Sequence, residues 1–198
     1  MNDRPVLVID LEATCSDDGS ISPQEMEIIE LGAVWVTPAG KVLDTLQRFV
    51  KPKLRPALTR FCTELTHISQ SDVDSAPSWP TVASELQAFA QLHTNGQCWG
   101  SWGAYDRRQI ERECVRHTLA YPLPDLRHEN LKALFAKDRE MKQVGMHMAL
   151  KLANLEPLGE HHRALSDAIN ISRLLPFIAN FNGGEVARPS DVTPAFDF

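Results

Sequence analysis

Three strand-like segments in the first 50 residues constrain the fold more than any other feature of this sequence. They span residues 6–9, 27–36 and 41–52, and valine, isoleucine and other strand formers recur in them. The turn-forming sequence TPAG, residues 37–40, separates the second segment from the third and predicts a hairpin. The sheet is therefore expected to have antiparallel first strands.

The remainder of the chain predicts helices and one further strand. Helical spacing of apolar residues and capping signals favour helices over residues 59–69, 79–93, 106–119, 129–137, 146–155 and 164–179, with a short strand over residues 97–102. This order indicates a mixed α/β fold and not an alternating doubly wound sheet. We expect one domain over residues 1–181 and an irregular, glycine- and proline-containing tail over residues 182–198.

Length, hydrophobic content and cysteine spacing favour a single soluble domain with reduced thiols. A chain of 198 residues that is 43% hydrophobic can form one well-packed domain. Its start lacks the pattern of a signal peptide and no apolar run approaches eighteen residues, so we expect a soluble, cytoplasmic protein without a membrane partner. The four cysteines are widely scattered, which favours reduced thiols over a zinc knuckle.

The net charge of −6 argues against a protein that coats nucleic acid through a global positive field. Bound divalent cations reverse the local sign of the potential, however. An acidic chain is therefore compatible with a nuclease whose site contains metal ions.

Two carboxylates follow the first strand segment. Asp10 and Glu12 are two residues apart, so in a continuous strand their side chains point to the same face and repel each other. Such a pair either sits at a solvated loop entrance or holds a cation between its members. The second interpretation requires partners from elsewhere in the chain.

Candidate partners lie in the second half of the sequence. Asp167 shares the apolar stripe of the last predicted helix with Ile171, and a buried carboxylate there needs a partner, a proton or a metal ion. His162 is five residues earlier, which on one helix would turn it away from Asp167, so it is expected in the preceding loop. Asp106 sits at a predicted helix start, where an ordinary N-cap is the alternative.

Taken together, these residues resemble a known set. Asp10 and Glu12 in DLEATC, Asp106 in SWGAYD, and His162 with Asp167 in HRALSD resemble the DEDD exonucleases of the histidine branch, DEDDh. The segments EIIELGAV and FCTELTHISQSDVDSAPSWPTV are similar to the subgroup that contains the Eri-1 type, the 3′ histone-mRNA exonuclease and bacterial relatives. The similarity covers residues 5–181 and implies an RNase H-like exonuclease fold.

The resemblance implies a metal-dependent 3′-5′ exonuclease that releases nucleoside 5′-monophosphates from RNA or single-stranded DNA 3′ ends. Two Mg²⁺ ions, which Mn²⁺ can replace, would bind Asp10, Glu12, Asp106 and Asp167, since hard cations prefer oxygen ligands. His162 would be the general base. Its neighbour His161 is the alternative, or else a solvated loop residue.

The resemblance also suggests substrate contacts, with Ile68 equally compatible with a place in the core. They are Ala13, Thr14, Thr66, His67 and Ile68. Two tryptophans either stack on bases or pack in the core, and three basic residues either contact phosphates or form a solvated face; these are Trp99, Trp102, Arg107, Arg108 and Lys142. The alternative functions are a DNA-trimming or short-oligonucleotide exonuclease and an inactive regulatory nucleic-acid-binding module.

Overall fold

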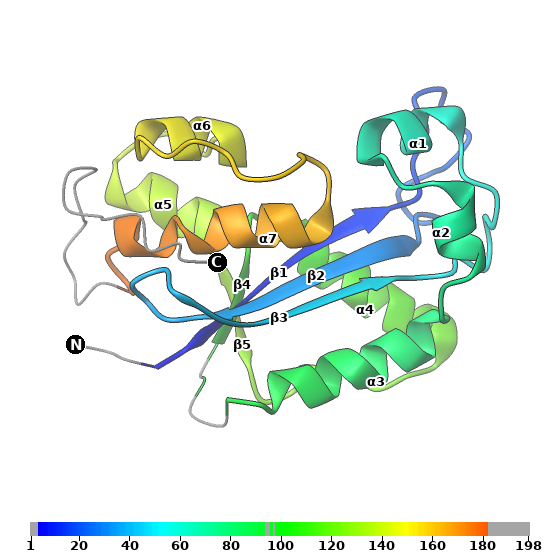
Figure 1. Cartoon of the computed structure of the whole chain (residues 1–198), viewed down its shortest axis with the longest axis horizontal. Coiled ribbons are helices and arrows are strands. Elements are labelled where there is room, and N and C mark those ends of the chain that lie inside the picture. The colour runs from blue at the N-terminus through cyan, green and yellow to red at the C-terminus, as the bar shows by residue number, and fades with distance from the viewer. Residues whose placement is uncertain (1–3, 94–95, 97, 182–198) are drawn as a thin grey trace.

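A mixed five-stranded sheet forms the centre of the computed structural model, which describes residues 4–93, 96 and 98–181 (Figure 1). Its strand order is β3-β2-β1-β4-β5. Strands β1 (Val6–Ala13), β2 (Ile28–Val36) and β3 (Val42–Phe49) are antiparallel neighbours, whereas β4 (Cys98–Ser101) and β5 (Arg127–Asn130) continue the sheet in parallel with β1. The predicted α/β sheet with antiparallel first strands is confirmed.

Helices cover both faces of this sheet (Figure 1). Helices α3 (Trp79–Ala90) and α4 (Tyr105–His117) pack on one face. Helices α5 (Leu131–Asp138), α6 (Met146–Leu152) and α7 (Ala164–Ser172) pack on the other. Helices α1 (Arg60–Thr66) and α2 (Gln70–Asp74) form a smaller group with a separate apolar cluster.

Alternation along β1 decides on which face the acidic residues lie. Leu7 and Ile9 belong to the core beneath α3 and α4, whereas Val6 and Val8 belong to the core beneath α5 to α7. Asp10 therefore continues the α7 side of the strand. Side-chain alternation thus places the acidic end of β1 under the N-terminus of α7.

A glycine opposite Asp10 allows α7 to approach the sheet. Gly32 pairs with Asp10 in the antiparallel register. A Cβ atom at Gly32 would lie 2.2 Å from the carbonyl carbon of Ala164, the first residue of α7. Because only hydrogen fits there, the first turn of α7 rests directly on the strand that neighbours Asp10.

Several predicted boundaries were wrong. The helix expected over residues 59–69 ends early, at Thr66, because His67 takes a left-handed conformation (φ 56°). A separate short helix that was not predicted, α2, follows it and is capped by Ser69. The last helix ends at Ser172 instead of near residue 179, and Pro176 lies in a 3₁₀ turn, Leu175–Phe177, that follows it.

Strand β5 was missed, and residues 129 and 130 belong to it instead of to the helix predicted over residues 129–137. Its sequence RHEN has no apolar run, so it forms a strand because β4 supplies a parallel neighbour. The first strand, in contrast, runs on to Ala13, so that Asp10 and Glu12 lie inside it.

The predicted tail over residues 182–198 lies outside the described residues, and the domain boundary at residue 181 stays a prediction. All four cysteines are free thiols. Over the part of the chain that the structure describes, no helix has both the length and the apolar character to cross a membrane.

Candidate active site

Four acidic side chains from three elements line one cavity of about 360 Å³. Asp10 and Glu12 come from β1, Asp106 from the first turn of α4 and Asp167 from the first turn of α7. Asp10, Glu12 and Asp167 each place a carboxylate oxygen within 4.8 Å of the other two. Residues that are up to 157 positions apart in sequence thus converge at the C-terminal end of β1.

The electrostatics of this cluster favour a bound cation. Burial, followed by the charges of Asp106, Glu12 and Asp167, raises the pKa of Asp10 well above its usual value. Burial and then Asp167 raise the pKa of Glu12 to about 8, and burial raises that of Asp106 to about 6. The protein alone therefore cannot keep all these carboxylates ionised at neutral pH. A hard divalent ion with oxygen ligands fits this donor set.

His162 lies in the turn before α7, where the spacing to Asp167 predicted it. It takes a left-handed conformation (φ 61°), and its backbone N–H donates to Asp167 Oδ2 at 3.0 Å. Its Nδ1 is 3.9 Å from Glu12 Oε1. Burial and the neighbouring His161 lower the pKa of His162, so the imidazole is neutral at neutral pH. A neutral imidazole at the cavity can accept a proton.

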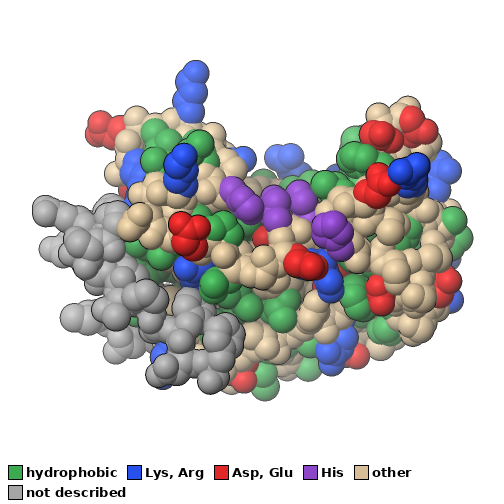
Figure 2. All heavy atoms as spheres, turned by 45° about the horizontal axis from the view of Figure 1, so that its top comes forward, with side chains coloured by type: hydrophobic (Ala, Val, Ile, Leu, Met, Phe, Trp, Pro, Cys, Tyr) green, Lys and Arg blue, Asp and Glu red, His purple; other side chains and the backbone are tan. Residues whose placement is uncertain are grey.

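Other histidines surround His162. The His161 ring stacks on it with centroids 3.8 Å apart, and the ring of His147, from α6, has its centroid 4.0 Å from that of His161. His161 Nδ1 also contacts Asp167 Oδ2 at 3.0 Å. Figure 2 shows histidine side chains gathered in a hollow between two raised parts of the surface. Sequence analysis did not connect His147 with the site, because its position follows only from the packing of α6.

A buried ion pair that sequence analysis also missed fixes the start of α7. Glu30 is fully buried on β2, directly opposite Glu12 in the antiparallel register. Its carboxylate accepts hydrogen bonds from Arg163 Nη2 and from the backbone N–H of Ala164, each at 3.0 Å. A carboxylate within the otherwise apolar strand IIELGAVWV was the available signal. Through this pair, β2 holds the turn that carries His162.

The five residues expected to contact substrate lie in two neighbouring segments, the end of β1 and the end of α1. The Thr59 hydroxyl donates to the Cys15 carbonyl at 2.6 Å and so joins these segments. His67 alone among the five has an exposed side chain. Thr14, Thr66 and Ile68 are buried; Thr14 accepts from the Glu27 N–H, Thr66 donates to the Cys62 carbonyl, and Ile68 belongs to a small apolar cluster. Ala13 is 8% exposed.

The remaining aromatic and basic candidates differ in burial and in whether they line the acidic cavity. Trp99 is fully buried in the core, whereas Trp102 lines the acidic cavity and donates its indole N–H to the Val144 carbonyl at 3.0 Å. Arg107, Arg108 and Lys142 are exposed, and none of them lines the cavity.

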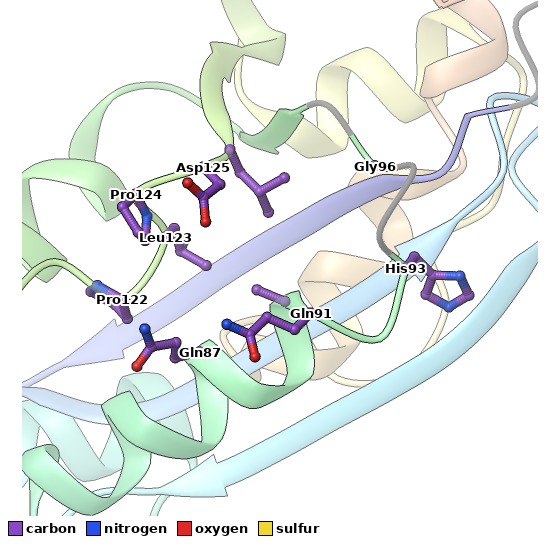
Figure 3. A pocket seen from close by; sticks show the side chains of 10 residues that line it. Gln87, Gln91, His93, Gly96, Pro122, Leu123, Pro124 and Asp125 are labelled. Atoms are coloured by element: carbon purple, nitrogen blue, oxygen red, sulfur yellow. The ribbon is translucent and has the colours of Figure 1, made fainter.

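A second cavity, of about 290 Å³, lies between the end of α3 and the loop before β5 (Figure 3). Its lining includes His93, Asp125 and the segment Pro122–Pro124, together with a glutamine from α3 and the glutamine that caps its C-terminus. It has no convergence of carboxylates, so the acidic cavity is the candidate active site.

Known proteins share both the sequence and this architecture. The exonuclease family RNase_T matches residues 7–175. The 3′-5′ exonuclease eri1 of Schizosaccharomyces pombe is 25% identical over 90% of this chain and 69% of its own length, and the probable 3′-5′ exonuclease KapD of Bacillus subtilis is 28% identical over 90% and 86%. The chain spans between 34% and 51% of the length of several vertebrate relatives.

Among solved structures, the nuclease domain of 3′hExo, described as a DEDDh family member bound to rAMP, superposes with a TM-score of 0.82. It is 25% identical in sequence, and the match covers 94% of this chain and 96% of that domain. These matches confirm the resemblance and the RNase H-like exonuclease fold predicted from the motifs. The chain therefore belongs to the RNase_T exonuclease family, whose DEDDh-type members depend on divalent metal ions.

Proposed function

We propose that this protein hydrolyses RNA from the 3′ end and releases nucleoside 5′-monophosphates, with single-stranded DNA as a second substrate. The observation that carries the proposal is the convergence of Asp10, Glu12 and Asp167 beside the imidazole of His162. The names of the eri1 and KapD relatives, both 3′-5′ exonucleases, and the rAMP bound to the similar nuclease domain support it.

The donor set favours Mg²⁺, which Mn²⁺ can replace, with Asp10, Glu12, Asp106 and Asp167 as the residues that would hold two ions. When bound, such ions polarise the scissile phosphate and the attacking water. Positive charge held there would offset both the burial and the mutual repulsion that raise the pKa values of Asp10 and Glu12. All four carboxylates can then ionise together.

His162 supplies the proton acceptor in this proposal. Water attacks phosphorus and its proton passes to the imidazole, while the bond from phosphorus to the 3′ oxygen breaks and that oxygen takes a proton from solvent to become the new 3′-hydroxyl. The backbone N–H of His162 is fixed by Asp167, and Glu30 with Arg163 anchors the same turn. The ring is thereby held close to Glu12 at the cavity, where the attacking water is required.

End-labelled single-stranded RNA and DNA of the same sequence test the proposal. We expect a ladder that shortens from the 3′ end with Mg²⁺ or Mn²⁺ and no cleavage with a chelator. Asp10→Ala should abolish the ladder, whereas Asp17→Ala, which removes an exposed acid from the loop after β1, should retain it. Intact RNA and DNA under every metal condition would contradict the proposal and favour a binding module.

A further inference from the structure

His161, His162 and Asp167 form a nitrogen-containing cluster beside the carboxylate site. One potential ligand atom of each lies within 4.8 Å of the others. His161 Nδ1 is 3.0 Å and 3.3 Å from the two oxygens of Asp167. His147 adds a third ring, whose centroid is 4.0 Å from that of His161.

These donors match Zn²⁺ better than Mg²⁺. Zinc binds imidazole nitrogen at about 2.0–2.1 Å and carboxylate oxygen at about 2.0–2.2 Å in a tetrahedron, so two of its ligand atoms are about 3.3 Å apart. The separations between His161 and Asp167 are close to this value. Magnesium prefers an all-oxygen environment and competes poorly for two imidazoles.

We infer that His161, His162 and Asp167 bind Zn²⁺, and that zinc bound there inhibits the enzyme. Zinc displaces the proton shared between His161 and Asp167, which leaves to solvent, and occupies a nitrogen lone pair of His162. An imidazole bound to zinc through that nitrogen no longer accepts a proton from water. The inhibition rests on the proposed function of His162, whereas zinc binding itself does not.

Direct titration tests the binding. Untagged protein in excess Mg²⁺ is titrated with Zn²⁺ by calorimetry, and we expect one tight site per chain. His161→Ala should weaken zinc binding about tenfold or more, because one of three protein ligands is lost. His93→Ala, which removes a histidine that pairs with Asp44 away from the site, should bind zinc as the wild type does.

Thiols are the competing zinc ligands. Cys15 and Cys62 pack together in the cluster near α1, so Cys15→Ser serves as the second control. Unchanged affinity in Cys15→Ser together with a loss in His161→Ala supports the inference. Equal affinity in the wild type and His161→Ala, or a loss confined to Cys15→Ser, overturns it.

Inhibition is measured as the Zn²⁺ concentration that halves Mg²⁺-supported RNA hydrolysis, relative to each variant's own rate without zinc. We expect this concentration to rise about tenfold or more in His161→Ala and to stay unchanged in His93→Ala. An unchanged midpoint in an active His161→Ala variant overturns the inhibitory role. If the wild type degrades no RNA with any metal, the proposed function fails, and the calorimetric titration still decides the zinc site.

Discussion

Replacement of Gly32 by alanine should lower turnover and stability, although no proposed catalytic residue is changed. The added Cβ would lie 2.2 Å from the Ala164 carbonyl carbon and 2.3 Å from the Leu165 nitrogen, whereas ordinary contacts begin at 3.4 Å. Both neighbours are backbone atoms, so α7 must move away from β2 by more than about 1 Å. Asp167 and the preceding His162 turn would move with the helix.

Misplacement by about 1 Å is enough to lower turnover about 100-fold, and overpacking costs about 1–3 kcal/mol of stability. We would measure kcat on single-stranded RNA and the free energy of unfolding in urea. Asp17→Ala, the exposed loop substitution used above, is the control and should leave turnover and stability unchanged. Wild-type turnover and stability in Gly32→Ala would refute the argument that α7 requires this close approach.

Three further predictions concern the base, the pH response and the buried ion pair. His162→Ala should lower kcat about 10²- to 10⁴-fold while Mn²⁺ binding, followed by calorimetry, is retained; an unchanged kcat would remove the base assignment. Because burial raises the pKa of Glu12 to about 8 from 4.5, the metal-free fold binds this proton more tightly than the unfolded chain and loses stability as pH rises between these values. Mg²⁺ should therefore raise Tm more near pH 8 than near pH 5 in thermal unfolding, and equal shifts would contradict the charge argument. Glu30→Ala leaves Arg163 and the Ala164 N–H without their acceptor and should cost about 3–5 kcal/mol in urea unfolding, whereas Glu30→Gln, which keeps an acceptor oxygen, should cost less; equal losses in the two variants would argue against the hydrogen bonds.

Local patterns were sufficient for the parts of the fold that depend on local chemistry. Alternation placed Asp10 and Glu12 on one face, and helical periodicity placed Asp167 on the buried side of α7. The impossibility of bringing His162 and Asp167 together on one continuous helix predicted the turn in which the structure places His162. These inferences needed only the geometry of a strand and of a helix.

Features that depend on distant partners escaped sequence analysis. Strand β5 exists because β4 is beside it, and the Glu30–Arg163 pair joins residues 133 positions apart. His147 reaches the site through the packing of α6, for which the sequence offered no separate signal. The convergence of Asp106 with the other acids was expected only through the family resemblance, because an N-cap explained that residue equally well.

The product released from the last phosphodiester bond distinguishes a 3′-5′ exonuclease from other nucleases. RNA carrying its label in that single phosphate is incubated with the enzyme and Mg²⁺, and the first labelled product is identified. We expect a labelled nucleoside 5′-monophosphate, formed with the wild type and lost with Asp10→Ala. Label that stays on the shortened RNA as a 3′-phosphate, or that first appears in a longer fragment cut internally, would contradict the proposed 3′-5′ exonuclease mechanism.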